Sequence, residues 1–288
     1  MTDGYGFTNS GHLAGRTMLM SGGSRGIGLA IATAAARLGA NIVLLAKTDQ
    51  PHPRLPGTVH TAKAGIEAAG GRAAAVVGDV REAADVDRAV ATALDTFGGI
   101  DIVVNNASAI DLAPSDELAL KKFDLMQSIN VRGTWLLTTR ALPYLRRCER
   151  AHVLTLSPPL NLSSRWLGIH PGYTLSKFGM TLLSRSWASE FEGTSISFSC
   201  LWPETLIATA AVRNVVGGAD RARSPQIMAD AAVAIFAMSP QQASGRCFLD
   251  TEVLTAAGGT DFARYGGSAD PALDIYVDAP HATVQQEP

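Results

Sequence analysis

Residues 17–39, TMLMSGGSRGIGLAIATAAARLG, decide how the rest of the chain is organised. A short apolar run at 17–20 enters a turn that holds three glycines, and an alanine-rich helical pattern leaves it. Gly22 allows a sharp exit from the strand, Gly26 lets the backbone approach a ligand, and Gly28 lets the helix pack on the sheet. The stretch therefore predicts a strand, a tight turn and a helix.

The predicted helix points its free N–H groups and the positive end of its dipole at the glycine turn. An anion would bind there, and the pyrophosphate of a dinucleotide fits. Three glycines alone also occur in ordinary loops, which is the alternative interpretation. The strand before this turn and the helix after it favour the dinucleotide site.

The chain has 288 residues, of which 47% are hydrophobic and 17% are charged, so it is long enough for one large α/β domain or two small ones. Its composition does not shift along the sequence, and we therefore expect one domain over residues 15–257. Residues 1–14 are expected to form a flexible arm. Residues 258–288 are rich in Gly, Asp and Pro, which predicts an extended or partly mobile C-terminal extension.

A net charge of −2 and the lack of a Lys/Arg run argue against binding to nucleic acid or anionic lipid. No apolar run reaches the length of a membrane span, and the N-terminal residues lack the apolar core of a signal peptide. Cys148, Cys200 and Cys247 lie far apart without metal-ligand spacing, which indicates reduced thiols and no metal site. We expect a cytoplasmic protein with a small-molecule substrate.

Apolar runs of strand length alternate with helical patterns along the chain. Strands are expected at 17–20, 41–46, 73–77, 100–104, 152–156, 195–201 and 245–250. Helical segments are expected at 59–69, 117–146, 172–191, 212–216 and 225–238. This alternation predicts an α/β fold with a single-domain, Rossmann-type, doubly wound parallel sheet.

The end of the second strand bears on the choice of cofactor. A site that selects the free ribose hydroxyl places an acid there, whereas a site that selects the 2′-phosphate uses a cation. This chain has Lys47 at that position, and Arg25 lies in the glycine turn nearby. We therefore predict NADP(H), with Lys47 and Arg25 as the phosphate cations. Two solvated basic residues are the alternative.

Polar residues also follow the third and fourth strands. Asp79, after the third strand, either accepts a hydrogen bond from an adenine amino group or caps the next helix, and both can hold. The fourth strand ends in NNAS at 105–108, where small and amide residues line the crevice of an open sheet. Asn130 falls inside the long helical pattern, which indicates a side-chain or backbone function unless it faces solvent.

Tyr173 and Lys177 open the helix that follows the fifth strand, and a four-residue separation puts them one turn apart on one face. A phenol with an ordinary pKa of about 10 is a poor acid or base near neutrality. An ammonium group one turn away would lower that pKa. The pair therefore predicts a catalytic site beside the glycine turn.

The glycine turn, NNAS, Ser157, Tyr173-x-x-x-Lys177 and Pro203 together resemble the classical short-chain dehydrogenase/reductases over nearly the whole chain. Within that family, AKTDQPHPRLPGT, LSPPLNL and LWPETLIATAA resemble the hydroxysteroid dehydrogenase-like protein 2 subgroup. Animal members of the subgroup carry a C-terminal sterol-carrier domain, which this sequence does not include.

The resemblance implies an NADP(H)-dependent oxidoreductase that moves a hydride between the nicotinamide and a carbonyl or secondary alcohol. Tyr173 would transfer the proton, Lys177 would lower its pKa and hold the nicotinamide ribose, and Asn130 would hold a water that relays protons. The implied catalytic residues are Tyr173, Lys177, Ser157 and Asn130. The implied cofactor-binding residues are Ser21, Gly22, Ser24, Arg25, Gly26, Ile27, Gly28, Lys47, Asp79, Val80, Asn106, Tyr173, Lys177, Pro203, Thr205 and Ile207.

The sequence departs from the family pattern at the catalytic serine. The family places a pair of serines at the end of the fifth strand and uses the second, but this chain has Ser157 followed by Pro158. We expect Ser157 to take the role, with Asn161 or Ser163 as alternatives. Past Pro203, Glu204 replaces the usual glycine, and Thr205 and Ile207 are our choices for contact with the carboxamide.

Trp166, Leu167, Trp202 and Leu206 near the expected mouth indicate a hydrophobic substrate, unless they are core or subunit contacts. One alternative reaction is reduction of the C=C bond of an enoyl thioester. A second alternative, suggested by Pro158, is an NADP(H)-binding sensor with little turnover. The helix at 172–191 has apolar positions on several faces, and the resemblance implies a homodimer or homotetramer through it.

Overall fold

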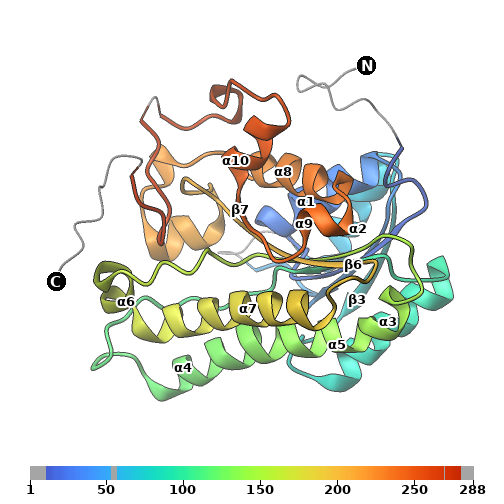
Figure 1. Cartoon of the computed structure of the whole chain (residues 1–288). Coiled ribbons are helices and arrows are strands. Elements are labelled where there is room, and N and C mark those ends of the chain that lie inside the picture. The colour runs from blue at the N-terminus through green and yellow to red at the C-terminus, as the bar shows by residue number, and fades with distance from the viewer. Residues whose placement is uncertain (1–10, 53–56, 269, 280–288) are drawn as a thin grey trace.

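The computed structural model describes residues 11–52, 57–268 and 270–279. Seven strands form one parallel sheet in the order β3-β2-β1-β4-β5-β6-β7 (Figure 1). The strands are β1 (Thr17–Ser21), β2 (Asn41–Ala46), β3 (Arg72–Val77), β4 (Ile102–Asn105), β5 (Ala151–Thr155), β6 (Ile196–Trp202) and β7 (Cys247–Leu249). The predicted Rossmann-type α/β fold is confirmed.

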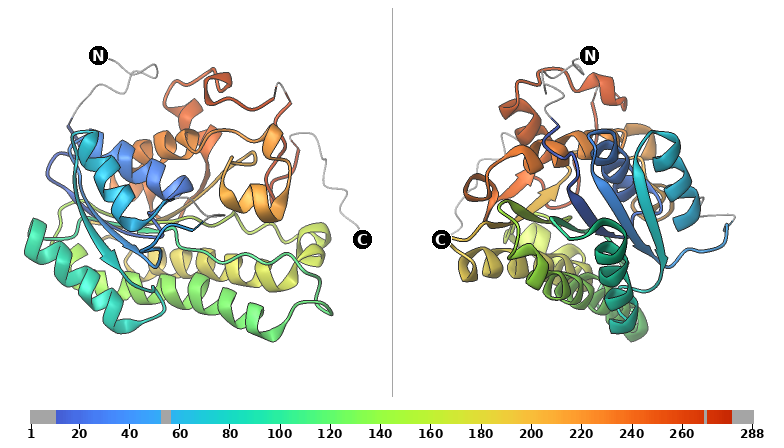
Figure 2. Two further views of the ribbon diagram at one scale, coloured as in Figure 1. Left: turned by 180° about the vertical axis from the view of Figure 1, so that it is seen from behind. Right: turned by 90° about the vertical axis from the view of Figure 1, so that its right-hand side faces the viewer.

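Helices cover both faces of the sheet (Figures 1 and 2). One face packs against α1 (Gly26–Arg37), α2 (Val59–Ala68), α8 (Gln226–Ala237) and α10 (Asp250–Ala256). The other packs against α3 (Ala83–Phe97), α5 (Gly133–Leu145) and α7 (Pro171–Glu190). The shorter helices are α4 (Leu120–Met126), α6 (Ser164–Ile169) and α9 (Pro240–Ala243), with single-turn 3₁₀ segments at Ala219–Arg221 and Ala263–Tyr265.

Strand order reverses at β1, which has β2 on one side and β4 on the other. Ser21 at the end of β1 pairs with Leu45 of β2 and with Asn105 of β4, so the carboxyl ends of these strands lie level. In open parallel sheets a ligand crevice forms at such a reversal. The glycine turn and the NNAS segment both leave the sheet at this point.

The helix expected over 117–146 is interrupted. It consists of α4, a π-helical turn at Gln127–Arg132 that contains Asn130, and α5. A second π-helical turn forms the predicted segment at Val212–Val216. Elsewhere the expected bounds shift by only a few residues, and the last strand is shortened to β7 because α10 begins at Asp250.

The expected terminal segments lie only partly within the described residues, which exclude 1–10 and 280–288. Leu13, in the expected arm, is fully buried. Tyr276, in the expected extension, is also buried, with its ring 5.1 Å from that of Phe178 and 5.8 Å from that of Trp166 between ring centres. The stretch of the extension around Tyr276 is therefore packed against the domain, and the prediction of an extended or partly mobile segment stays untested for the rest.

No helix among the described residues has the length and apolarity needed to cross a membrane.

The glycine turn is fixed to the segment after β4 by the Asn106 amide, which donates to the carbonyl oxygens of Gly22 (2.9 Å) and Ser21 (3.2 Å). Gly22 has φ +73°, a conformation that favours glycine, and a Cβ there would lie 2.8 Å from Ala107 Cα. A Cβ at Gly28 would lie 2.5 Å from Asn106 Nδ2. Two of the three glycines are thus required by packing against the chain itself.

We predict that Gly28→Ala destabilises the fold by about 1–3 kcal/mol, because the added methyl displaces the Asn106 amide. The matched control is Gly65→Ala in α2, where a Cβ meets nothing within 4 Å. That change should stabilise by about 0.4–1 kcal/mol. Chemical unfolding of both variants measures the difference, and equal free energies of unfolding would contradict the packing role of Gly28.

Candidate active site

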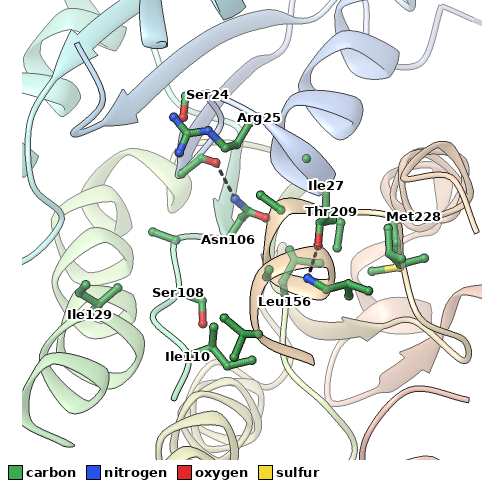
Figure 3. Close-up of a pocket in the computed structure, with 18 of the residues that line it drawn as sticks. Ser24, Arg25, Ile27, Asn106, Ser108, Ile110, Ile129, Leu156, Thr209 and Met228 are labelled. Carbon is green, nitrogen blue, oxygen red and sulfur yellow. Dashed lines mark hydrogen bonds between the residues drawn. The ribbon is translucent and has the colours of Figure 1, made fainter. Parts of the chain in front are cut away.

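A cavity of about 590 Å³ lies at the carboxyl end of the sheet, where the strand order reverses (Figure 3). Its walls come from the glycine turn, the ends of β2, β3 and β4, helix α7, the segment after β6, and the C-terminal segment. Most of the predicted site residues line it: Gly22, Ser24, Arg25, Gly26, Ile27, Lys47, Asp79, Val80, Asn106, Tyr173, Lys177, Pro203 and Ile207. Five predicted residues are not in its lining: Ser21, Gly28, Ser157, Asn130 and Thr205.

The glycine-turn end of the cavity can accept an anion. Helix α1 begins at Gly26 and has no acidic residue in its first turn, so no carboxylate opposes a negative ligand there. Gly26 has φ +56°, and a Cβ there would lie 3.5 Å from Thr209 Cγ2. Arg25 donates a hydrogen bond from its guanidinium to the Gly57 carbonyl oxygen at 2.6 Å, which fixes it beside this turn.

Lys47, at the end of β2, is paired with Asp79, at 3.0 Å between Nζ and Oδ2. Arg81 donates to the same Asp79 oxygen from Nε at 3.0 Å and from Nη2 at 2.6 Å. Although burial opposes it, these contacts hold the pKa of Asp79 well below its ordinary value. Lys47 remains 59% exposed. Asp79 therefore keeps a partner in Arg81 if Lys47 turns toward a ligand.

Asp79 does not cap the following helix, which was one of the two roles predicted for it. The N-cap residue of α3 is Glu82. Asp79 instead accepts a hydrogen bond from the backbone N–H of Arg81 at 3.0 Å, two residues on, which makes an Asx turn. The capping alternative is wrong because α3 begins at Ala83, four residues after Asp79.

Tyr173 and Lys177 both reach the cavity from the first turns of α7 and are 5% and 3% exposed. Lys177 Nζ donates to the Leu156 carbonyl oxygen at 2.5 Å and lies 5.0 Å from the centre of the Trp202 ring. Burial lowers the pKa of Lys177 to about 7. The ammonium is held at a fixed point in an apolar setting.

The pKa of Tyr173 differs from the sequence-based expectation. Burial raises it well above the ordinary value, and Tyr276 and Asp274 add to the rise, while a hydrogen bond with Ser108 lowers it. Lys177 points its Nζ at a carbonyl oxygen rather than at the phenol. The structure by itself therefore does not show the lowered pKa that the pair predicts.

Asn130 uses its whole side chain to join two segments. Its Oδ1 accepts from the Ala109 N–H at 2.8 Å, and its Nδ2 donates to the Ala109 carbonyl oxygen at 3.0 Å and to Ser176 Oγ at 2.9 Å. Asn130 is fully buried, so the alternative of a solvent-facing side chain is wrong. The observed function is to hold the NNAS segment to α7.

Ser157 and Thr205 are placed behind the cavity wall. Ser157 is fully buried and its hydroxyl faces the Cys200 thiol of β6. Thr205 is buried in an isolated antiparallel bridge with Leu273. Ile207, the other residue expected at the carboxamide, does line the cavity.

The C-terminal segment contributes residues that the sequence does not mark. Asp274 and Ile275 line the cavity, and Trp202 Nε1 donates to the Ile275 carbonyl oxygen at 3.0 Å. Burial raises the pKa of Asp274 to about 7, Asp250 adds to the rise, and Lys177 opposes it. No motif identifies this segment, because its residues act through contacts far apart in sequence. Ser108 also lines the cavity, although the sequence distinguishes it only as part of NNAS.

The apolar residues expected at the mouth divide into two groups. Trp202 and Leu206 line the cavity. Trp166 is a core residue that packs on Tyr276, and Leu167 is 43% exposed on α6. Trp202 and Leu206 are thus placed to contact a hydrophobic substrate, whereas Trp166 is a core residue, which was the alternative.

Asp250, fully buried at the start of α10, anchors the segment after β6. Its Oδ1 accepts from the N–H of Glu204 at 2.9 Å and from the N–H of Thr251 at 2.8 Å. Burial raises the pKa of Asp250 to about 7 despite these hydrogen bonds. The carboxyl group therefore fixes the loop that carries Pro203 and Ile207.

Comparisons with known proteins agree with this geometry. A family model described as short chain dehydrogenase matches residues 16–218. Hydroxysteroid dehydrogenase-like protein 2 of Xenopus tropicalis is 47% identical over 274 residues, which cover 94% of this chain and 65% of the relative. The chain thus spans less than two thirds of that relative's length. The expected resemblance to this subgroup is confirmed.

Two solved structures share the fold and much of the sequence. A putative dehydrogenase from Xanthomonas campestris has a TM-score of 0.89 and 45% identity, covering 93% of this chain and 99% of that one. A short chain dehydrogenase of Mycobacterium thermoresistibile has a TM-score of 0.87 and 44% identity, covering 96% and 100%.

We predict that Asp250→Asn changes how stability depends on pH. Because the pKa of Asp250 is raised from about 4 in the unfolded chain to about 7, the folded protein binds more protons between these values. Its contribution to stability therefore falls as pH rises from about 4 to 7. Asparagine keeps the Oδ1 acceptor without ionising. The stability of the variant relative to wild type should therefore increase as pH rises from about 4 to 7. Urea unfolding at several pH values measures this, and parallel curves would contradict it.

Proposed function

Since the chain belongs to the short chain dehydrogenase family, we propose that it is an NADP(H)-dependent oxidoreductase acting on a carbonyl or secondary alcohol of a hydrophobic substrate. One observation carries the proposal: Tyr173 and Lys177 enter the same cavity as the glycine turn. A dinucleotide whose pyrophosphate lies at the start of α1 would reach from there toward α7.

The chain fits such a cofactor at three points. The first turn of α1 and Ser24 would hold the pyrophosphate, Asp79 and Val80 would border the adenine, and Lys177 would hold the nicotinamide ribose. When bound, the nicotinamide supplies the hydride that adds to the carbonyl carbon, or accepts it in the reverse direction. Pro203 and Ile207 would border the nicotinamide.

Tyr173 is the proposed proton donor in reduction. As the carbonyl carbon gains a hydride, the C=O electron pair moves to oxygen, which takes the phenolic proton to give the alcohol. The phenolate that results needs stabilisation, and Lys177, which lines the same cavity with its Nζ held by the Leu156 carbonyl oxygen, would supply the positive charge. Asn130 as the holder of a relay water and Ser157 as an oxygen ligand stay predictions from the family resemblance.

The preference for the 2′-phosphate rests on charge at the end of β2. Lys47 and Arg25 line the cavity there, and Lys47 is largely exposed. Asp79, the acid in the cavity lining at this end, is already paired with Arg81. A phosphate would therefore meet two cations without a competing free carboxylate.

The proposal of a hydrophobic substrate is based on the apolar residues that line the cavity. Ile110, Leu156, Trp202, Leu206 and Ile275 line the cavity, and Ile110, Trp202 and Ile275 belong to the same apolar cluster as Tyr173. Such a wall favours an apolar substrate body with one polar group at the reacting oxygen.

Assembly through α7 belongs to the same proposal. Leu175 and Leu182 on this helix are 57% and 54% exposed, two turns apart on one face. A second copy of the chain would cover them in a homodimer or homotetramer. The cytoplasm is the compartment that we propose.

Tyr173→Phe is the first test of the reaction. It should lower kcat by about 10²–10⁴-fold with NADPH and a panel of ketones, aldehydes and enones, because the proton donor is lost. NADPH binding, followed by fluorescence, should persist. Product identification separates carbonyl from C=C reduction. Binding without Tyr173-dependent turnover on every member of the panel would support the sensor alternative instead.

Lys47→Ala tests the choice of cofactor. Loss of a charge-assisted contact to the 2′-phosphate should weaken NADPH binding by about 10-fold or more and leave NADH binding nearly unchanged. Lys63→Ala in α2, an exposed lysine paired with Glu67, is the matched control and should change neither. Equal losses for both nucleotides at Lys47 would rule out its assignment to the phosphate.

A further inference from the structure

The reaction proposed above calls for a second hydroxyl beside Tyr173, and the residues expected to supply it lie elsewhere. Ser157 faces Cys200 from inside the core. Asn161 donates to the Asp278 carboxylate at 2.6 Å, and Ser163 precedes α6 on the surface. None of the three is in the cavity lining.

Ser108 is in that lining, in the same cavity as Tyr173. Figure 3 shows it beside Ile110, on the segment that leaves β4. Its hydroxyl lies close enough to the Tyr173 phenol to lower the pKa of that phenol by hydrogen bonding, and its Oγ donates to the Ala109 carbonyl oxygen at 3.3 Å. A serine hydroxyl and a phenol thus meet at one point of the cavity wall.

The contact between Ser108 and Tyr173 is built into the scaffold. Asn130 binds both backbone groups of Ala109, the residue after Ser108, and donates to Ser176 Oγ. Ser176 Oγ in turn donates to the Tyr173 carbonyl oxygen at 2.8 Å. These hydrogen bonds therefore fix the backbone beside Ser108 relative to the backbone of Tyr173, which is the kind of preorganisation that catalysis requires.

We propose that Ser108 is a catalytic residue that donates a hydrogen bond to the substrate oxygen, in place of the serine expected at the end of β5. The inference rests on the proposed function. Ser108 keeps its proton throughout. It stabilises the negative charge that develops on the oxygen as the C=O electron pair moves there, and Tyr173 alone transfers a proton. Ser108 of the NNAS sequence thereby replaces the hydroxyl that is missing at Pro158.

Kinetics of four variants test this on any substrate that wild type reduces. Ser108→Ala should lower kcat/KM by about 10²-fold, because an oxyanion donor is removed. Ser108→Thr, which keeps a hydroxyl, should recover most of the loss. Ser157→Ala should lose less than Ser108→Ala. Tyr173→Phe establishes that the turnover measured is the proposed reaction, so failure of that reaction is recognised separately from failure of the role of Ser108.

The pH profile distinguishes catalysis from mere support of the loop. Tyr173 is faced by Ser108, Asp274 and Tyr276, with Lys177 on its own helix, and the Ser108 hydrogen bond lowers the pKa of the phenol. Ser108→Ala should therefore move the rise of alcohol oxidation to higher pH, and Ser108→Thr should move it back.

Two results would overturn the proposal. One is a loss in Ser157→Ala that exceeds the loss in Ser108→Ala. The other is a loss in Ser108→Ala that matches a fall in melting temperature or in NADPH affinity, with an unshifted pH profile.

Discussion

The buried amide of Asn130 is the contact on which the geometry of the candidate site depends. It satisfies the N–H and the C=O of Ala109 and also donates to Ser176, so one side chain joins the end of β4 to α7. Loss of such a group leaves buried polar partners unpaired, at a cost of about 1–3 kcal/mol each. The π-helical turn at Gln127–Arg132 presents this side chain inward in the middle of an otherwise regular helix pair.

A second constraint is the buried charge in and behind the cavity wall, since Lys177 and Asp274 line the cavity and Asp250 lies outside its lining. Lys177, Asp250 and Asp274 each have a pKa of about 7, although their ordinary values lie far apart. Burial moves acids and bases in opposite directions and so brings them together. The pKa of Asp274 depends on the charges of the other two groups, because Asp250 raises it and Lys177 lowers it.

Local sequence patterns predict the fold and much of the site because the forces behind them are local. Apolar runs identify the strands, and the glycine turn and the Tyr173–Lys177 spacing identify the crevice. Contacts between residues that are far apart in sequence cannot be predicted from such local patterns. The Arg81 partnership of Asp79, the burial of Ser157 and the Asn130 bridge each involve side-chain directions that no periodicity specifies. The C-terminal segment shows this best, since its composition indicates a loose tail and its packing makes it a wall of the site.

The two ends of the cavity are built by parts of the chain that lie far apart in sequence. The glycine turn and the end of β2 lie early in the chain, whereas residues 270–279 return late and border the end of the cavity near Tyr173. Substitutions in this late segment would reshape the cavity near Tyr173 and leave the glycine turn and the end of β2 unchanged. Related chains could thus differ in the substrate that they accept while they share one cofactor. Residues 270–279 could also be exchanged as a unit to change substrate preference.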